Sequence, residues 1–323
     1  MTYLLLIVGL VLIIAGANYL TEGASALARR LRMSDFLIGL TIVAIGTSMP
    51  ELIVSLLSAL DGKTDMALGN VIGSNLFNGF VILGLCALIR PIPYTRDNIR
   101  RDIPFGIVAA LLLIAAALPF GAQGSVVRGE GIVLLLAYAA FMYVTIRGSK
   151  QPEPAEPAES AGTPAEPKAD APRPMALWLT AVLIVGGLAA LVGGGELVLD
   201  SAVKIARSWG VSDAFISITL LAGGTSLPEL ASSIASLVKG RSAMALGNVI
   251  GSNITNILLI LGLSAAAHPL STADITTLDF GMLLASAVLL LLTAFAFRRA
   301  ALDRVEGALF LVIYLSYIAL LLR

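Results

Sequence analysis

The sequence contains one cysteine and one histidine in 323 residues, and each scarcity excludes a class of site. Cys86 alone cannot form an intrachain disulfide or a multi-cysteine metal site. His268 alone cannot supply the several imidazoles that copper and zinc centres favour. We therefore expect Cys86 to be an ordinary core residue and His268 an ordinary loop residue.

Charge is also scarce. Only 13% of the residues are charged and the net charge is zero, whereas soluble domains carry roughly 25% charged residues. Because the charges balance, the protein has no overall positive charge that would attract nucleic acid, and we exclude nucleic acid as a partner. The mean hydropathy is +0.93, and weakly charged runs such as 3–20 and 131–146 approach the roughly 20 residues that span a bilayer. The composition indicates a polytopic helical membrane protein whose surroundings are a lipid bilayer.

Ten candidate spans follow one another along the chain. The first carries no Lys or Arg before its apolar run, so we expect a retained helix rather than a signal peptide. Residues 149–174 are rich in Pro, Ala and Glu, which is typical of a disordered or polyproline-like tether, and they separate segments 1–148 and 175–323 with five spans each. The spans are expected near 3–24, 36–59, 66–89, 104–120, 129–147, 176–198, 213–238, 243–266, 279–297 and 305–322.

The two five-span segments are related by an internal repeat. Residues 39–85 and 217–263 align without gaps at an offset of 178 and are identical at 26 of 47 positions. Because each segment has an odd number of spans, the second is expected to cross the membrane upside down relative to the first. The fold class is therefore an all-α membrane protein with ten transmembrane helices in two inverted five-helix repeats, an architecture of many secondary transporters.

The distribution of basic residues predicts the orientation. Sixteen of the 21 Lys and Arg residues fall in one set of alternate loops, which includes 149–174. By the positive-inside rule this set is cytoplasmic, so both termini face outside. We expect a multi-pass protein of the plasma (inner) membrane.

A proline and a carboxylate recur inside apolar segments, in "GTSMPEL" (46–52) and "GTSLPEL" (224–230). Pro50 and Pro228 lack an N–H group and crowd the carbonyls of Gly46 and Gly224, so each helix should be interrupted there. Lipid offers the freed carbonyls around 44–46 and 222–224 no partner. Such a break persists where protein, water or a bound cation satisfies it.

Helical spacing gathers polar residues into four stripes, and none of the stripes contains Lys, Arg or His. Carboxylate, amide, hydroxyl and carbonyl oxygens are the ligands that calcium takes, six to eight at a time. Two glutamates would neutralise one divalent cation or take up protons. Structural carboxylates bonded to freed backbone, and interhelical hydrogen bonds from the Asn and Ser side chains, remain alternatives. The stripes are Thr47, Glu51, Ser55, Ser58; Thr225, Glu229, Ser233, Ser236; Asn70, Ser74, Asn78; and Asn248, Ser252, Asn256.

The motif pairs "AIGTSMPE" with "GNVIGSNLFN" and "AGGTSLPE" with "GNVIGSNITN" resemble the two alpha-repeats of the cation/calcium exchanger superfamily, closest to the prokaryotic sodium/calcium exchangers. The resemblance covers nearly the whole chain. It implies that Glu51 and Glu229 are the central ligands of the transported cations. It further implies side-chain ligands or close supports, and backbone-carbonyl ligands, at Thr47, Ser48, Thr225, Ser226, Ser74, Ser252, Asn78, Asn256, Ala44 and Ala222.

The resemblance also implies a function. The chain is expected to be a secondary antiporter, not an enzyme, that exchanges Ca²⁺ for Na⁺ by alternating access at a midplane site and needs no cofactor. The family is thought to alternate by sliding its first and sixth helices. Glycines there would suit a loosely packed pair, at Gly16, Gly186, Gly187, Gly193, Gly194 and Gly195.

Other functions compete with this expectation. A Ca²⁺/H⁺ antiporter would use the same glutamates and belongs to the same superfamily. An intramembrane hydrolase is a remote alternative, because aspartyl chemistry in membranes uses Asp pairs and the sequence has no HExxH motif. A simple channel would not require paired broken helices of mirrored topology.

One departure from the family pattern concerns charge. Some exchangers have Asp at the positions of Asn78 or Asn256, and this chain has Asn at both. The predicted site therefore carries two formal negative charges. Ca²⁺ would leave it neutral, and three Na⁺ ions would leave it at +1.

Overall fold

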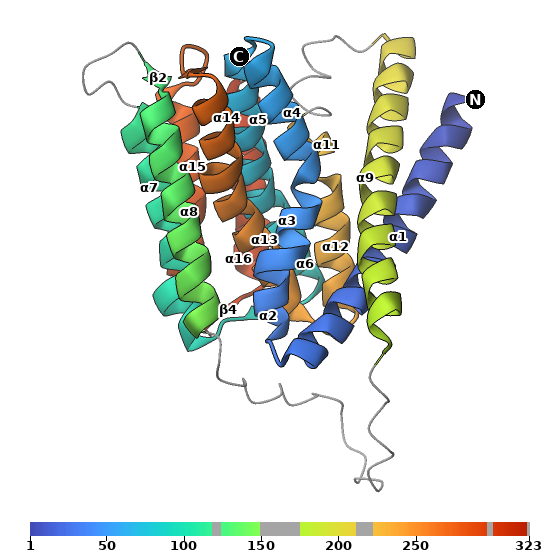
Figure 1. Cartoon of the computed structure of the whole chain (residues 1–323). Coiled ribbons are helices and arrows are strands. Elements are labelled where there is room, and N and C mark those ends of the chain that lie inside the picture. The colour runs from blue at the N-terminus through green and yellow to red at the C-terminus, as the bar shows by residue number, and fades with distance from the viewer. Residues whose placement is uncertain (118–123, 149–174, 211–221, 296–299, 322–323) are drawn as a thin grey trace, which may run out of the picture.

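The computed structural model describes residues 1–117, 124–148, 175–210, 222–295 and 300–321, and these form a bundle of helices with four two-residue strands (Figure 1). Each of the ten expected spans contains a described helix, which confirms the all-α fold. Six of the described helices are long and apolar enough to cross a membrane, or seven if a bent pair over 35–60 is one span. The count of ten crossings stays a prediction. The predicted tether 149–174 and the beginning of the seventh span, up to 221, lie outside the described residues.

The first repeat begins with a long helix, followed by broken helices and then two more regular ones. Its elements are α1 (Thr2–Leu31), α2 (Asp35–Ile38), the π-helical turn η1 (Gly39–Val43), α3 (Ala44–Thr47), α4 (Met49–Leu60), α5 (Thr64–Leu76), the π-helical turn η2 (Phe77–Ile82), α6 (Leu83–Ile89), the π-helical turn η3 (Asn98–Asp102), α7 (Ile103–Ala117) and α8 (Arg128–Gly148).

The second repeat has corresponding elements in the same order. They are α9 (Leu177–Ser208), α11 (Ala222–Gly224), α12 (Leu227–Val238), α13 (Ser242–Ile254), the π-helical turn η5 (Thr255–Ile260), α14 (Leu261–Ala267), α15 (Thr277–Thr293) and α16 (Arg304–Leu321).

Two short antiparallel strand pairs join the repeats. β1 (Ile92–Pro93) pairs with β4 (Ala301–Leu302), with Ile92 opposite Leu302. β2 (Ser125–Val126) pairs with β3 (Leu270–Ser271), with Ser125 opposite Ser271. The labelled strands β2 and β4 lie at opposite ends of the bundle in Figure 1, as inverted repeats require.

The core lies along the third helical segment of each repeat. Within the most apolar windows, 67% of residues in 64–89 and 78% in 242–267 are buried, compared with 22% in α8, α9 and α16. The outer helices expose large apolar side chains such as Trp178 and Leu136, which suits contact with lipid. Cys86 is buried in this core and His268 is exposed at the end of α14, as expected for both.

The predicted interruptions of the helices are present. Ser48 leaves helical geometry at φ −79°, ψ 9°, and the chain bends by 46° between 35–47 and 49–60. Pro50 then occupies the first turn of α4, where its missing N–H costs no intrahelical bond. Ser226 has nearly the same geometry, φ −88°, ψ 9°, before Pro228 and α12.

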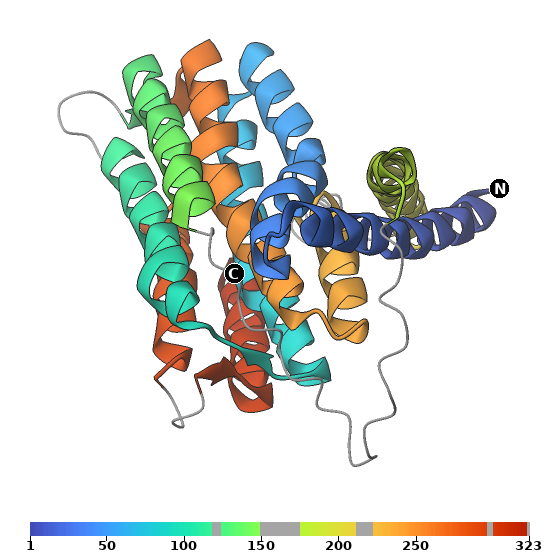
Figure 2. The ribbon, with the colours of Figure 1, turned by 60° about the horizontal axis from the view of Figure 1, so that its bottom comes forward.

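The helices α1 and α9 lie side by side in both ribbon views and touch through glycines (Figures 1 and 2). A Cβ atom added to Gly16 would lie 2.7 Å from the carbonyl oxygen of Gly187, and one added to Gly187 would lie 2.6 Å from the backbone nitrogen of Leu20. The expectation of a loosely packed pair is therefore wrong at these positions, because the missing side chains bring the two backbones into contact. Of the six glycines named above, Gly186 and Gly193 are the two at which an added Cβ atom would meet nothing within 4 Å.

Adjacent glycines of α9 provide a test of this contact. We expect Gly187→Ala to lower the free energy of unfolding by about 1–3 kcal/mol, because the added methyl group would overlap the backbone of α1. Gly186→Ala is the matched control, since its added methyl group meets nothing within 4 Å. Thermal unfolding of the detergent-solubilised variants measures the difference, and equal melting temperatures would contradict the packing described here.

Candidate cation site

Glu51 and Glu229 occupy the first turns of α4 and α12, directly after the two breaks, and both are fully buried. The free N–H groups of a helix N-terminus give that end a partial positive charge, which favours a carboxylate there. Neither glutamate forms an ion pair with any residue in the described part of the chain.

The two repeats meet through crossed hydrogen bonds. Ser48 Oγ of the first repeat donates to Glu229 Oε1 at 2.9 Å, and Ser226 Oγ of the second donates to Glu51 Oε1 at 3.0 Å. Ser74 Oγ also donates to Glu51 Oε1, at 3.3 Å. Each break thus holds the carboxylate of the opposite repeat, which places both glutamates at the interface between the repeats.

The second carboxylate oxygens are left without partners. Oε2 of Glu51 and Oε2 of Glu229 are buried and accept no hydrogen bond. Asn78 has neither of its amide atoms bonded, and Asn256 Oδ1 is also unpartnered. Buried polar atoms without partners are rare and costly. A group of such oxygens, with hydroxyls beside them, fits a hard cation such as Ca²⁺ or Na⁺.

Asn70 and Asn248 link the helices that carry the two glutamates to their neighbouring helices. Asn248 Nδ2 donates to Ser233 Oγ at 2.9 Å and to the carbonyl of Glu229 at 3.3 Å, and Asn70 Nδ2 donates to Ser55 Oγ at 3.0 Å. These bonds tie α12 to α13 and α4 to α5. The predicted stripes therefore contain two layers, an inner layer with free oxygens and an outer layer that is already hydrogen-bonded.

The remaining hydroxyls lie beside the carboxylates. Thr47 Oγ1 donates to Asn248 Oδ1 at 3.3 Å, and Thr225 Oγ1 lies 3.3 Å from Ser74 Oγ. Ser252 Oγ is 3.5 Å from the carbonyl oxygen of Ala44.

The carbonyl of Ala44 differs from the expectation that the helix break would free it. The carbonyl of Ala44 accepts the N–H of Ser48 at 3.0 Å, so it is not freed by the break, although its second lone pair can still accept a ligand. This happens because a regular turn persists up to Ser48. Ala222 begins α11, and the contacts of its carbonyl are not among those the structure describes.

The sequence pattern did not reveal the π-helical turns or the role of Asn75. The turns η2 and η5 lie at corresponding positions of the repeats and carry Asn78 and Asn256. Such wide turns are frequent at functional sites. The identity of the repeats along 66–75 and 244–253 was the only signal available.

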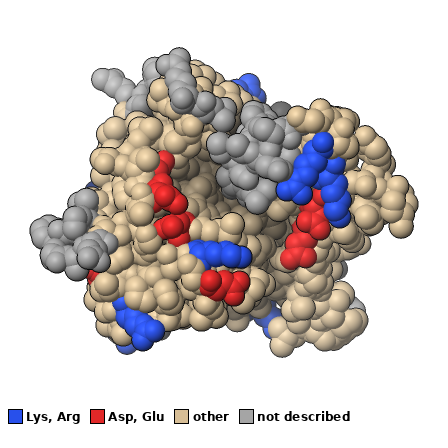
Figure 3. All heavy atoms as spheres, turned by 90° about the horizontal axis from the view of Figure 1, so that it is seen from above, with Lys and Arg blue, Asp and Glu red and all other residues tan. Residues whose placement is uncertain are grey.

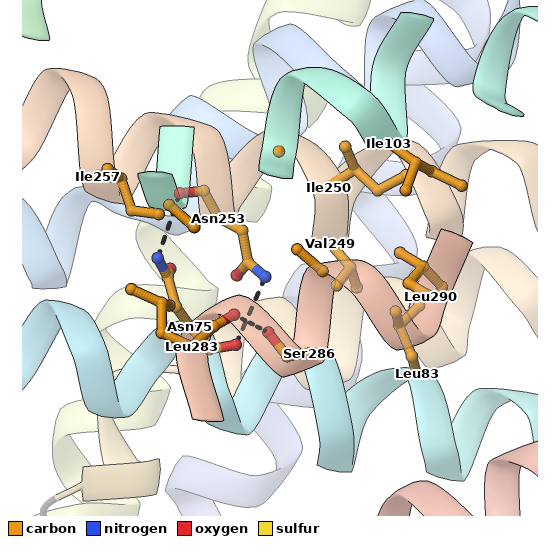
Figure 4. Close-up of a pocket in the computed structure, with 14 residues that line it drawn as sticks. Asn75, Leu83, Ile103, Val249, Ile250, Asn253, Ile257, Leu283, Ser286 and Leu290 are labelled. Atoms are coloured by element: carbon orange, nitrogen blue, oxygen red, sulfur yellow. Dashed lines mark hydrogen bonds between the residues drawn. The ribbon is translucent and has the colours of Figure 1, made fainter. Parts of the chain in front are cut away.

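Asn75 and Asn253 form a reciprocal pair between α5 and α13 (Figure 4). Asn75 Nδ2 donates to the carbonyl of Asn253 at 3.3 Å, and Asn253 Nδ2 donates to the carbonyl of Asn75 at 3.4 Å. Asn75 Oδ1 also accepts from Asn256 Nδ2 at 3.1 Å. Asn75 therefore orients the amide of Asn256, and the Oδ1 atom of Asn256 is left without a hydrogen bond.

Known proteins resemble this chain over nearly its whole length. A family model described as "Sodium/calcium exchanger protein" matches residues 1–147 and 179–323. The chain is 38% identical over 313 residues to "Putative antiporter CaxA" of Alkalimonas amylolytica, covering 96% of this chain and 95% of that one. It is 32% identical to "Sodium/calcium exchanger MaX1" of Methanosarcina acetivorans, covering 99% and 98%. A solved structure of the sodium-calcium exchanger NCX_Mj superimposes with a TM-score of 0.80 at 32% identity, covering 99% of both chains.

The unequal bonding of Asn75 and Asn253 provides a test of the support layer. We expect Asn75→Ala to lower the unfolding free energy by about 1–3 kcal/mol, because it removes two hydrogen bonds and leaves their partners buried. Asn253→Ala deletes the same atoms but only one hydrogen bond of its side chain, since its Oδ1 has no partner. Its cost should be roughly half as large. Thermal unfolding measures both, and a larger loss for Asn253→Ala would contradict the assignment.

Proposed function

This chain belongs to the sodium/calcium exchanger family, and on that premise we propose that it exchanges Ca²⁺ for Na⁺ across the membrane by alternating access at the Glu51–Glu229 site. It is an integral membrane protein of the cation-exchange antiporters. The observation that carries the finer proposal is the pair of buried, unpartnered Oε2 atoms on glutamates held crosswise by Ser48 and Ser226.

The proposed ligand shell is built from oxygen atoms alone. Glu51 and Glu229 supply the charge, and the Oδ1 atoms of Asn78 and Asn256 supply neutral donors. The hydroxyl and carbonyl groups close to them complete the six to eight oxygens that Ca²⁺ takes. These further candidates are Thr47, Ser48, Ser74, Thr225, Ser226, Ser252, Ala44 and Ala222.

The charges explain why transport would be coupled exchange. An empty site holds two carboxylates in the membrane interior without a basic partner. Switching the access of such a charged site from one side of the membrane to the other is costly. One Ca²⁺ neutralises both charges, and Na⁺ ions compensate them as well, with three leaving the site at +1. Sliding of α1 and α9 is therefore favoured only when the site holds cations. One ion species then returns in exchange for the other.

Proton coupling is the second candidate, because the same two glutamates would be neutral if protonated. The named relatives favour sodium: MaX1 and NCX_Mj are both described as sodium/calcium exchangers. The sign of the loop charges further supports an orientation in the plasma (inner) membrane with the 149–174 face in the cytoplasm and both termini outside.

Substitution of a central glutamate tests the site. We expect Glu51→Gln to reduce Ca²⁺ uptake into sodium-loaded proteoliposomes at least 100-fold, because an uncharged amide replaces one of two carboxylates. Glu22→Gln is the matched control, since Glu22 is an exposed glutamate of α1. Wild-type uptake by folded Glu51→Gln protein would exclude the proposed site.

The driving ion is tested separately. Uptake of radioactive Ca²⁺ should follow an outward sodium gradient and should be faster with the vesicle interior positive, because three departing Na⁺ ions carry one more charge than Ca²⁺ brings in. A proton gradient without sodium should give no uptake. If uptake instead required only the proton gradient, the exchange would be Ca²⁺/H⁺.

A further inference from the structure

The two faces of the molecule are not closed to the same extent. The offset of 178 pairs α1 with α9 and α4 with α12. Toward the face where α8 ends and α9 begins, hereafter the linker face, α1 packs on α12. Thr21 and Ala24 of α1 are 1% and 0% exposed there, and Thr21 Oγ1 lies 3.3 Å from Ser236 Oγ.

The corresponding contact on the opposite face, hereafter the N-terminal face, is open. Leu199 and Ala202, the counterparts of Thr21 and Ala24, are both partly exposed. A cavity of ≈ 110 Å³ separates α9 from α4, and the space-filling view shows that this face is hollowed (Figure 3). Its lining includes Ile53, Val54, Glu196, Leu199, Thr225 and Pro228.

The cation site opens toward the same cavity. Thr225 lines the cavity and is partly exposed, whereas its counterpart Thr47 is fully buried. Asn70 is likewise partly exposed, and its counterpart Asn248 is only 1% exposed. Among the described residues, those that are identical in sequence thus differ in accessibility, and the more accessible ones lie toward the N-terminal face.

A lysine bridges the closed contact. Lys239 follows the last residue of α12, and its Nζ donates to the carbonyl oxygen of Asn18 on α1 at 2.9 Å. The counterparts of this pair on the N-terminal face are Asp61, at the end of α4, and Glu196 on α9. An aspartate cannot donate to a carbonyl, so the repeat offers no equivalent bond there.

Side-chain size adds to the difference. The surface of α12 that meets α1 carries Ala231 and Ala235, which let the helices approach closely. The same positions on α4 are Ile53 and Leu57, which are 47% and 55% exposed. Closing α9 onto α4 would require these larger side chains to fit between the helices.

We propose that Lys239 is a latch that holds the linker face closed, and that the lack of a donor at Asp61 makes the chain rest with its cation site open to the N-terminal face. The inference rests on the alternating-access exchange proposed above. It assigns to Lys239 control of the equilibrium between the two access states, without contact with the transported ions.

Thiol accessibility in full-length protein in nanodiscs tests the latch. In a Cys86→Ala background, Ala235→Cys places a thiol on the surface of α12 that packs against α1, where it is partly buried and a hydrophilic maleimide reacts faster once α1 has moved away. Its modification rate therefore rises with the population of that state. We expect Lys239→Ala to raise the rate about two- to five-fold, the size of a partly exposed charged hydrogen bond. Lys239→Arg should keep the original rate.

The matched control and a second variant make the result decisive. Lys63→Ala removes an exposed lysine on the N-terminal face and should leave the Ala235→Cys rate unchanged. Asp61→Lys supplies the missing donor, so it should raise the Ala235→Cys rate about two- to five-fold and slow the modification of Ile53→Cys.

Two negative results have different meanings. If Lys239→Ala matches Lys63→Ala, or if Asp61→Lys changes neither rate, the latch is excluded while exchange can still operate. If the Ala235→Cys rate is the same in every variant and is unchanged by Na⁺ and Ca²⁺, then α1 does not move, and the alternating-access proposal is overturned together with the latch.

Discussion

The structure depends on one constraint: two buried carboxylates lie inside a membrane bundle with no basic side chain in their polar stripes. Such a pair needs compensation, and the fold supplies part of it. The helix breaks place Glu51 and Glu229 at the positive ends of α4 and α12, and the break residues Ser48 and Ser226 donate to them crosswise. Because each donor comes from the opposite repeat, the inverted duplication is what allows the two halves to satisfy each other.

Much of this arrangement could be predicted from the sequence, because it follows from local patterns. Proline inside an apolar segment predicts a break, and four-residue spacing predicts that Glu51, Ser55 and Asn70 lie on buried helix faces. The crossed serine bonds, the wide turns η2 and η5 and the orienting role of Asn75 depend on how helices distant in sequence meet. Gly16 and Gly187 suggested loose packing, but the structure shows close backbone contact. A glycine is compatible with both flexibility and close packing, so the sequence alone cannot distinguish them.

Identical residues in the two repeats acquire different roles. Asn256 is fixed by a hydrogen bond to Asn75, whereas both amide atoms of Asn78 are unpartnered. One side of the site is therefore held rigidly and the other can adjust. A site that alternately holds one divalent ion and several monovalent ions needs this combination, because the two loads place their oxygen ligands differently. Neutral amides at both positions keep the formal charge at −2, which one Ca²⁺ balances.

The contacts of α1 and α9 fit the proposed exchange between two access states. Backbones touching at Gly16 and Gly187 join the two helices into one unit. In the described part of the chain, polar ties from this unit to α12 and the residue that follows it include Thr21 with Ser236 and Asn18 with Lys239. A transporter must populate both states, so their free energies can differ by only a few kcal/mol. An exposed tie such as that of Lys239 meets that requirement, since it contributes little and can still decide which state predominates.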